Sequence, residues 1–349
     1  MEEKRISNIE MLRVMSMFAI ILHHYYAHGD FLIDGVFTIN EIIVQLLSSG
    51  GKIAVDIFVI ISGFFLVEKK FSWLKICKFL SCTYIWGLLI LGFAIIYSGG
   101  IGNIDTHFIR KSLNPLTPVN GFAETYLHMY ILFPLINKLI RKCTQKKLGY
   151  VIAIMVGTFF VIPTITNASM GGHLKSLLMF ITFYIIGSYI RLYYSAFLSK
   201  VFQVIGLISL IVIWGTILYH DYLSKYDLFY LEKSNIMVHA FSGADIFVLL
   251  SAIGIFLWFK DHTLRYNHLI NKIATTVFGI YLIHDNGFIR NLLWNKWLNV
   301  SDYSLSDFFF LHMIFVSLLV FVVCSFLEYL RIQFLEKPMM KRLSRYVQK

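Results

Sequence analysis

Most of the chain consists of apolar runs of about 20 residues, the length that spans the hydrocarbon core of a bilayer as one helix. Short polar segments separate these runs. They predict about ten transmembrane helices, at residues 9–27, 48–67, 77–98, 121–140, 149–166, 174–194, 201–219, 239–259, 270–288 and 308–332. The pattern therefore predicts an all-α, polytopic membrane protein.

The predicted helices and their short loops use up the 349 residues of the chain. We find neither an internal repeat nor a Gly/Ser-rich linker that would divide it. The first apolar run has a basic start, but it lacks a small-residue cleavage site and contains Arg13, so we interpret it as a span rather than a signal peptide. We expect one integral-membrane domain over residues 1–349 and no fused soluble domain.

Composition supports a membrane location. Hydrophobic residues make up 58% of the chain and charged residues 15%, with a mean hydropathy of +0.70, whereas soluble domains carry about 25% charged residues. The formal net charge of +11 raises the question of nucleic acid. However, the basic residues form short clusters between apolar runs rather than one stripe. We therefore expect a lipid bilayer, and no nucleic acid, as partner.

The distribution of Lys and Arg predicts the orientation, because cytoplasmic flanks of membrane spans are enriched in both. With the N-terminus in the cytoplasm, flanks on that side hold 22 Lys and Arg residues and the opposite flanks hold seven. Arg13 and Lys52 are left out because they fall within or beside spans. Both termini are thus predicted to be cytoplasmic.

The cysteines give no sign of a disulfide framework or a metal centre. No two of them form a CxxC pair, and none has metal-ligand spacing with histidine; they are Cys77, Cys82, Cys143 and Cys324. We expect neither structural disulfides nor a metal site.

An ionisable residue inside a membrane helix costs about 2.5–3.5 kcal/mol and is a functional candidate. The most informative ones in the first predicted span are Arg13 and His24. Arg13 and His24 are eleven residues apart, which is three turns plus about 20°, so they share one helix face about 16 Å apart. One interpretation is a polar track leading to a histidine base, because imidazole exchanges protons near neutral pH. The alternative is that His24 belongs to an interfacial aromatic belt while Arg13 reaches the inner surface.

The second predicted span carries Asp56 between apolar residues, at about the depth of His24. A carboxylate there would orient the imidazole and stabilise its protonated form. The alternative is a structural pair with another polar residue. Two weaker pairs, Glu124 with His128 and His284 with Asp285, are candidates for an outward acceptor site, or are structural or interfacial.

Several segments resemble a known family. Arg13, ten intervening residues and His24 lie within EMLRVMSMFAIILHH, and GGKIAVDIFVIISGFFL follows. The later segments FYIIGSYIR and TTVFGIYLIHD add similarity further along. Together they resemble the membrane-bound acyltransferase-3 family of cell-surface glycan O-acyltransferases.

The resemblance implies about ten helices and transfer of an acyl group from cytoplasmic acyl-CoA to a hydroxyl of an extracytoplasmic glycan or polysaccharide. It implies acetyl as the first choice of acyl group, acetyl-CoA as a substrate rather than a bound cofactor, and a bacterial plasma membrane as the setting. A separate extracytoplasmic partner or a homo-oligomer is compatible with it.

The resemblance also implies residue roles. Arg13, His24 and Asp56 correspond to the polar residues of the family's two N-terminal blocks. The family's RxxR pattern is here Lys75-Ile-Cys-Lys78, which keeps the charge but loses the bidentate geometry of guanidinium. We expect Lys75 and Lys78, with Arg13 deeper along the path, to bind the phosphates of acyl-CoA.

We expect His24, oriented by Asp56, to remove the acceptor proton so that the oxygen attacks the thioester carbonyl. An acyl-histidine intermediate is an alternative. A different class, a transporter with Arg, His and Asp as a proton or ion relay, is disfavoured by the lack of a repeat, of matching broken helices and of acidic residues. Retention of His24 and Arg13 argues against an inactive family member that serves as a binding partner.

Overall fold

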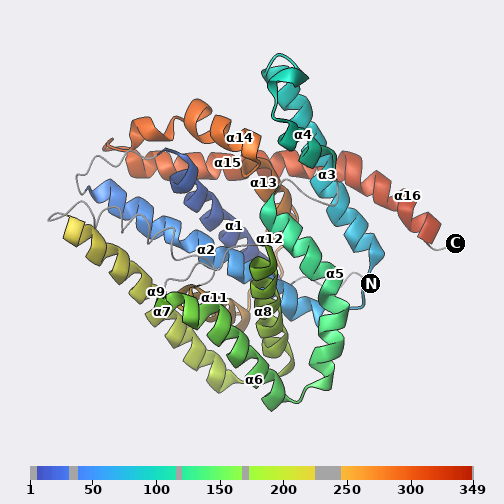
Figure 1. Ribbon diagram of the computed structural model, residues 1–349, viewed down its shortest axis with the longest axis vertical. Coiled ribbons are helices and arrows are strands. Elements are labelled where there is room, and N and C mark those ends of the chain that lie inside the picture. Colours follow the sequence, from blue (N-terminus) through green and yellow to red (C-terminus); the bar gives the residue numbers. More distant parts are fainter. Residues whose placement is uncertain (1–5, 31–37, 115–119, 167–172, 225–244, 348–349) are drawn as a thin grey trace.

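Helices account for all regular structure in the described part of the chain. The computed structural model describes residues 6–30, 38–114, 120–166, 173–224 and 245–347. The long helices are α1 (Ser7–His28), α2 (Ile39–Leu66), α3 (Trp73–Tyr97), α5 (Gly121–Lys142), α8 (His173–Leu192), α9 (Ala196–Ser224), α11 (Ile246–Asp261) and α15 (Phe309–Arg331) (Figure 1). The predicted all-α class is thus confirmed.

Among the described residues, five helices are long and apolar enough to cross a bilayer, which makes the chain a multi-pass membrane protein. They are Ile39–Leu66, Trp73–Tyr97, Gln145–Thr166, Ala196–Leu223 and Phe309–Leu343, and Ser176–Leu192 is a shorter apolar helix. The total of about ten spans and the side on which the termini lie stay predictions. The first part of the expected span 239–259 falls outside the described residues.

Helix α2 lies at the centre of the bundle, where it packs against α1, α8, α9 and α11. Of the residues in its apolar stretch, 72% are buried inside the protein. In the other four candidate spans only 11–39% are buried, so those helices expose more side chains. An apolar outer surface of this kind suits contact with lipid. Residues from α2 are therefore placed to contact several other helices at once.

Glycines let α2 approach its neighbours closely. A Cβ on Gly63 would lie 2.1 Å from the carbonyl oxygen of Tyr184 in α8, and one on Gly187 would lie 2.1 Å from that of Ile60 in α2. Between α9 and α11, Gly206 and Gly254 face each other in the same way. Small residues at such crossings are the usual basis of helix association in membranes, where dispersion contacts replace the hydrophobic effect.

Residues 270–288, predicted as one helix, form separate helices instead. Helix α12 (His268–Ile273) and helix α13 (Val277–His284) are joined by a turn. There, the backbone N–H groups and the hydroxyls of Thr275 and Thr276 all donate to carbonyl oxygens three residues earlier. Hydroxyl bonds to nearby backbone compete with regular helix. The apolar run gave no sign of this break.

Two further helices lie outside the predicted spans. Helix α4 (Thr106–Leu113) packs beside α3, and helix α16 (Lys337–Val347) continues from α15 through a π-helical turn, Ile332–Glu336. In Figure 1, α16 extends away from the rest of the bundle. A second π-helical turn, Gly157–Val161, joins α6 (Gln145–Val156) to α7 (Ile162–Thr166).

We expect Gly187→Ala to lower the melting temperature of the purified protein, because the new methyl group would meet the backbone of α2. A clash of this kind costs about 1–3 kcal/mol. Gly92→Ala is the matched control, since a Cβ there meets nothing within 4 Å. Melting of both variants in the same detergent checks the prediction, and equal temperatures would contradict it.

Candidate active site

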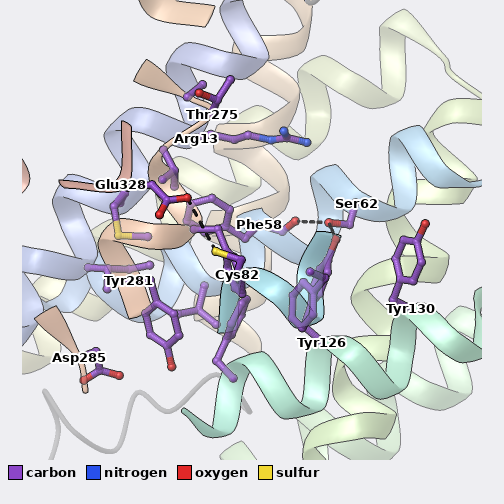
Figure 2. Close-up of a pocket in the computed structure, with 18 of the residues that line it drawn as sticks. Arg13, Phe58, Ser62, Cys82, Tyr126, Tyr130, Thr275, Tyr281, Asp285 and Glu328 are labelled. Atoms are coloured by element: carbon purple, nitrogen blue, oxygen red, sulfur yellow. Dashed lines mark hydrogen bonds between the residues drawn. The ribbon is translucent and has the colours of Figure 1, made fainter. Parts of the chain in front are cut away.

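A cavity of about 790 Å³ lies among helices α1, α2, α3, α5, α8, α13 and α15. One face of α1 forms part of its wall through Arg13, Met17, Ile20 and His24. Because Arg13 and His24 are eleven residues apart on that face, the cavity follows α1 for about 16 Å. Figure 2 shows Arg13 near one end of the cavity and Asp285 near the other, with Glu328 between them.

Three histidines and one aspartate lie together at the end of the cavity near Asp285. We call this group the imidazole end, and its members are His24, His28, His284 and Asp285. His24 Nδ1 lies 3.0 Å from His284 Nε2. Asp285 Oδ1 lies 3.7 Å from His24 Nδ1 and 3.6 Å from His28 Nε2. Two segments that are 260 residues apart in sequence thus meet around one carboxylate.

The hydrogen bonds fix the tautomers of two of these histidines. His284 Nδ1 lies 2.6 Å from the carbonyl oxygen of Ile280. A carbonyl only accepts, so His284 Nδ1 carries the proton and His284 Nε2 is an acceptor. His24 Nδ1 must then donate to it. In neutral His24 this leaves Nε2 unprotonated, with a lone pair available as a base.

The preceding residue, His23, anchors this part of α1 against α2. His23 Nδ1 donates to the carbonyl oxygen of Ser48 over 3.0 Å. A Cβ on Gly51 would lie 2.3 Å from the Cβ of His23, so only glycine allows this approach. Of the two adjacent histidines, His23 holds the helix in place while His24 faces the cavity.

Asp285 follows the last turn of α13 and is held from two other sides. Asn120 donates to its main-chain oxygen over 3.0 Å, and Arg290 donates to its Oδ1 over 2.7 Å. Arg290 lies in α14 (Gly287–Asn291), which begins just after the carboxylate. Asp285 thus lies between α13 and α14, with its carboxylate beside His24.

Asp56 does not occupy the position that we predicted for it. Its carboxylate is fully buried, and neither oxygen has a hydrogen-bond partner in the described part of the chain. Its electrostatic neighbours are Lys52 and Asp245. Gly51 faces α1, and Asp56, five residues later, is rotated from it by about 140°. The carboxylate beside His24 is that of Asp285.

The opposite end of the cavity, which we call the basic end, is lined by Arg13, Lys75 and Lys78. Arg13 lies 3.5 Å from Glu10 and half-buried, and Lys78 Nζ lies 2.7 Å from Glu336 Oε1. Lys75 is exposed and forms no ion pair with any described residue. The structure thus places both lysines and Arg13 on one cavity, and their binding of acyl-CoA stays a prediction.

A buried charge cluster lies next to the basic end, and sequence reasoning missed it. Arg331 donates from Nε and Nη2 to the two carboxylate oxygens of Glu328, each over 2.8 Å. Trp86 Nε1 donates to Glu328 Oε2 over 2.7 Å. Gly279 leaves room for the carboxylate, since a Cβ there would lie 2.1 Å from it. The sequence did offer a signal for this cluster, because Glu328 and Arg331 are ionisable residues within the apolar run 308–332.

The π-helical turn after α15 completes this cluster. Arg331 Nη2 also donates to Glu336 Oε2 over 2.5 Å. Residues five apart lie on different faces of an α-helix but stack in a π-helix, whose bonds join i and i+5. The wide turn therefore brings Glu336 back to Arg331 while its other oxygen binds Lys78.

The side wall of the cavity carries hydroxyl groups. Ser62 and Tyr126 hydroxyls lie 3.1 Å apart, and the buried hydroxyl of Tyr130 has no hydrogen-bond partner among the described residues (Figure 2). These three residues line the cavity. Glu124 and His128, which we predicted as an acceptor site, do not: Glu124 is half-buried and His128 is exposed elsewhere on α5.

Comparison with known proteins identifies the family of the chain. The family model described as an acyltransferase domain matches residues 6–329, which is nearly the whole chain and includes both ends of the cavity. No curated protein and no solved structure matches the chain. The chain therefore belongs to the acyltransferase-3 family.

Proposed function

We propose that this protein transfers an acyl group, with acetyl as the first choice, from cytoplasmic acyl-CoA to a hydroxyl of an extracytoplasmic glycan. The observation that carries the proposal is the cavity that joins Arg13, Lys75 and Lys78 to His24, whose Nε2 is left free to accept a proton. The three basic side chains suit a donor that carries phosphates, and the free Nε2 of His24 suits the hydroxyl of an acceptor.

The basic end suits the phosphates of coenzyme A. Lys75 pairs with no carboxylate of the described residues, whereas Lys78 is paired with Glu336 and would exchange that partner for a phosphate oxygen. Arg13 lies deeper, on the same face of α1 as His24 and about 16 Å from it along the helix. The pantetheine arm would follow the wall formed by Phe79, Tyr126 and Tyr130, where hydroxyls meet its amides, and would bring the thioester to the imidazole end.

In the proposed reaction His24 Nε2 takes the proton of the acceptor hydroxyl while its oxygen attacks the thioester carbonyl. The C–S bond then breaks, and the imidazolium returns the proton to the departing sulfur. His284 Nε2 accepts the hydrogen bond from His24 Nδ1 throughout. The Asp285 carboxylate, 3.7 Å from His24 Nδ1, stabilises the imidazolium. The same lone pair would attack the thioester if an acyl-histidine forms first.

The sidedness rests on the excess of Lys and Arg on the flanks of the basic end. With that end in the cytoplasm, His24 and Asp285 lie toward the outside, where cell-surface glycans are found. We propose a bacterial plasma membrane as the setting. A separate partner outside, or a second copy of the chain, would present the acceptor.

The first test is release of free coenzyme A by the full chain in liposomes, with acetyl-CoA and a panel of glycans. We expect glycan-dependent release that His24→Ala lowers at least about 100-fold, the contribution of a general base. His107→Ala, an exposed histidine on α4, is the control and should match wild type. A His24-dependent proton or solute flux without any release would instead support a transporter.

The tautomer argument predicts different effects for two substitutions of His284. His284→Leu removes the acceptor for the His24 Nδ1 proton, so kcat should fall at least about tenfold with little change in KM. His284→Gln restores an acceptor oxygen and should recover part of the loss. Steady-state kinetics of both variants check this. Equal kcat values for the two variants would show that His284 contributes by packing alone and not as a hydrogen-bond acceptor.

The basic end predicts an effect on donor binding. Lys75→Ala should raise KM for acyl-CoA about tenfold and leave kcat nearly unchanged, because a charge-assisted bond to phosphate contributes about 1.5 kcal/mol. Lys70→Ala removes an exposed lysine that does not line the cavity and is the control. An equal KM in the two variants would rule out a role of Lys75 in donor binding.

A further inference from the structure

Three groups at the imidazole end form a set that matches metal coordination. His24 and His28 are four residues apart and therefore lie on one face of α1. Asp285 approaches both from the end of α13. One ligand atom from each of the three lies within 4.8 Å of the other two. Cysteine and histidine spacing could not reveal this set, because Asp285 comes from a distant segment.

The distances are close to those of an occupied site. Two ligands bound to tetrahedral zinc at about 2.0–2.2 Å lie about 3.3–3.6 Å from each other. Asp285 Oδ1 lies 3.6 Å from His28 Nε2 and 3.7 Å from His24 Nδ1. Both distances to Asp285 are thus within a few tenths of an ångström of that spacing, and the ligand atoms of His24 and His28 lie within 4.8 Å of each other. His24 and Asp285 also line the cavity, which gives an ion a route to them.

We propose that His24, His28 and Asp285 bind a divalent transition-metal ion of the zinc type, and that the bound ion blocks acyl transfer. Two imidazoles and one carboxylate are a donor set that selects such ions over Mg²⁺ or Ca²⁺. The binding stands on the geometry alone. The blocking rests on the proposed function, in which His24 is the base.

Metal binding and base action exclude each other at His24. Nδ1 faces Asp285, and a metal bound there takes its lone pair. The remaining proton of the neutral ring then sits on Nε2, which can no longer accept one from an acceptor hydroxyl. The hydrogen bond to His284 Nε2 is lost as well. Inhibition therefore follows from the tautomer and needs no blockage of the cavity.

Two cations oppose the metal. Arg290 donates to the same Asp285 oxygen over 2.7 Å, and Lys52 interacts electrostatically with that carboxylate. Arg290 is 38% exposed, so it can move into water when an ion arrives. Its removal should therefore strengthen metal binding, which distinguishes coordination by Asp285 from a general loss of structure.

The test uses the full chain in detergent, purified through a tag without histidine, stripped of metal and titrated with Co²⁺ by visible absorption. We expect a saturable one-equivalent band in wild type, binding at least about tenfold weaker in His28→Ala, and tighter binding in Arg290→Gln. His107→Ala removes an exposed histidine and should match wild type. No saturable band in wild type, or equal affinity in His28→Ala, would overturn the proposal.

Zinc X-ray absorption of the wild-type protein tests the site without any substitution. Two imidazole ligands near 2.0 Å with one oxygen ligand are expected, and a shell of oxygen alone would overturn the proposal. Zn²⁺ should also inhibit coenzyme A release in wild type, at concentrations at least about tenfold lower than in His28→Ala. A chain that releases no coenzyme A but still binds Co²⁺ would refute the proposed function and leave the metal site in place.

Discussion

The close contact of α1 with α2 is the constraint on which the rest of the site depends. Gly51 lets the backbone of α2 reach His23, and the bond from His23 to Ser48 fixes the rotation of α1. With that rotation set, the face that carries Arg13 and His24 turns toward the cavity. In lipid, where water does not drive helices together, such glycine contacts and interhelical hydrogen bonds determine how spans are arranged.

Sequence predicted the features that depend on one helix at a time. Apolar runs located the helices, and a period of 3.6 residues placed Arg13 and His24 on one face. It did not predict that Asp285, rather than Asp56, lies beside His24. Nor did it predict the turn at Thr275 and Thr276, where two hydroxyls bond to the backbone between α12 and α13 inside an unbroken apolar run. Pairing between distant spans is set by packing, which a single sequence does not display.

The cluster of Glu328, Arg331 and Glu336 shows a similar limit. Glu328 and Arg331 are three residues apart, an ordinary α-helical spacing, but Arg331 and Glu336 are five apart, a spacing that suits no α-helical pair. Only the π-helical turn brings Glu336 back to Arg331. Lys78 forms an ion pair with Glu336, whereas Lys75 forms none with any described residue. Two lysines that look equivalent in the sequence therefore differ in the structure.

The hydrogen bond from His284 to Ile280 has a consequence for the electrical balance of the membrane. It ties the Nδ1 proton of His284 to the backbone of α13, so His284 Nε2 can only accept a hydrogen bond from His24. In the proposed reaction, the proton that His24 Nε2 takes from the acceptor hydroxyl therefore goes to the departing sulfur and not to His284. Under that proposal, the acyl group would move outward while one proton leaves with the coenzyme A thiol, and the exchange would carry no net charge across the bilayer.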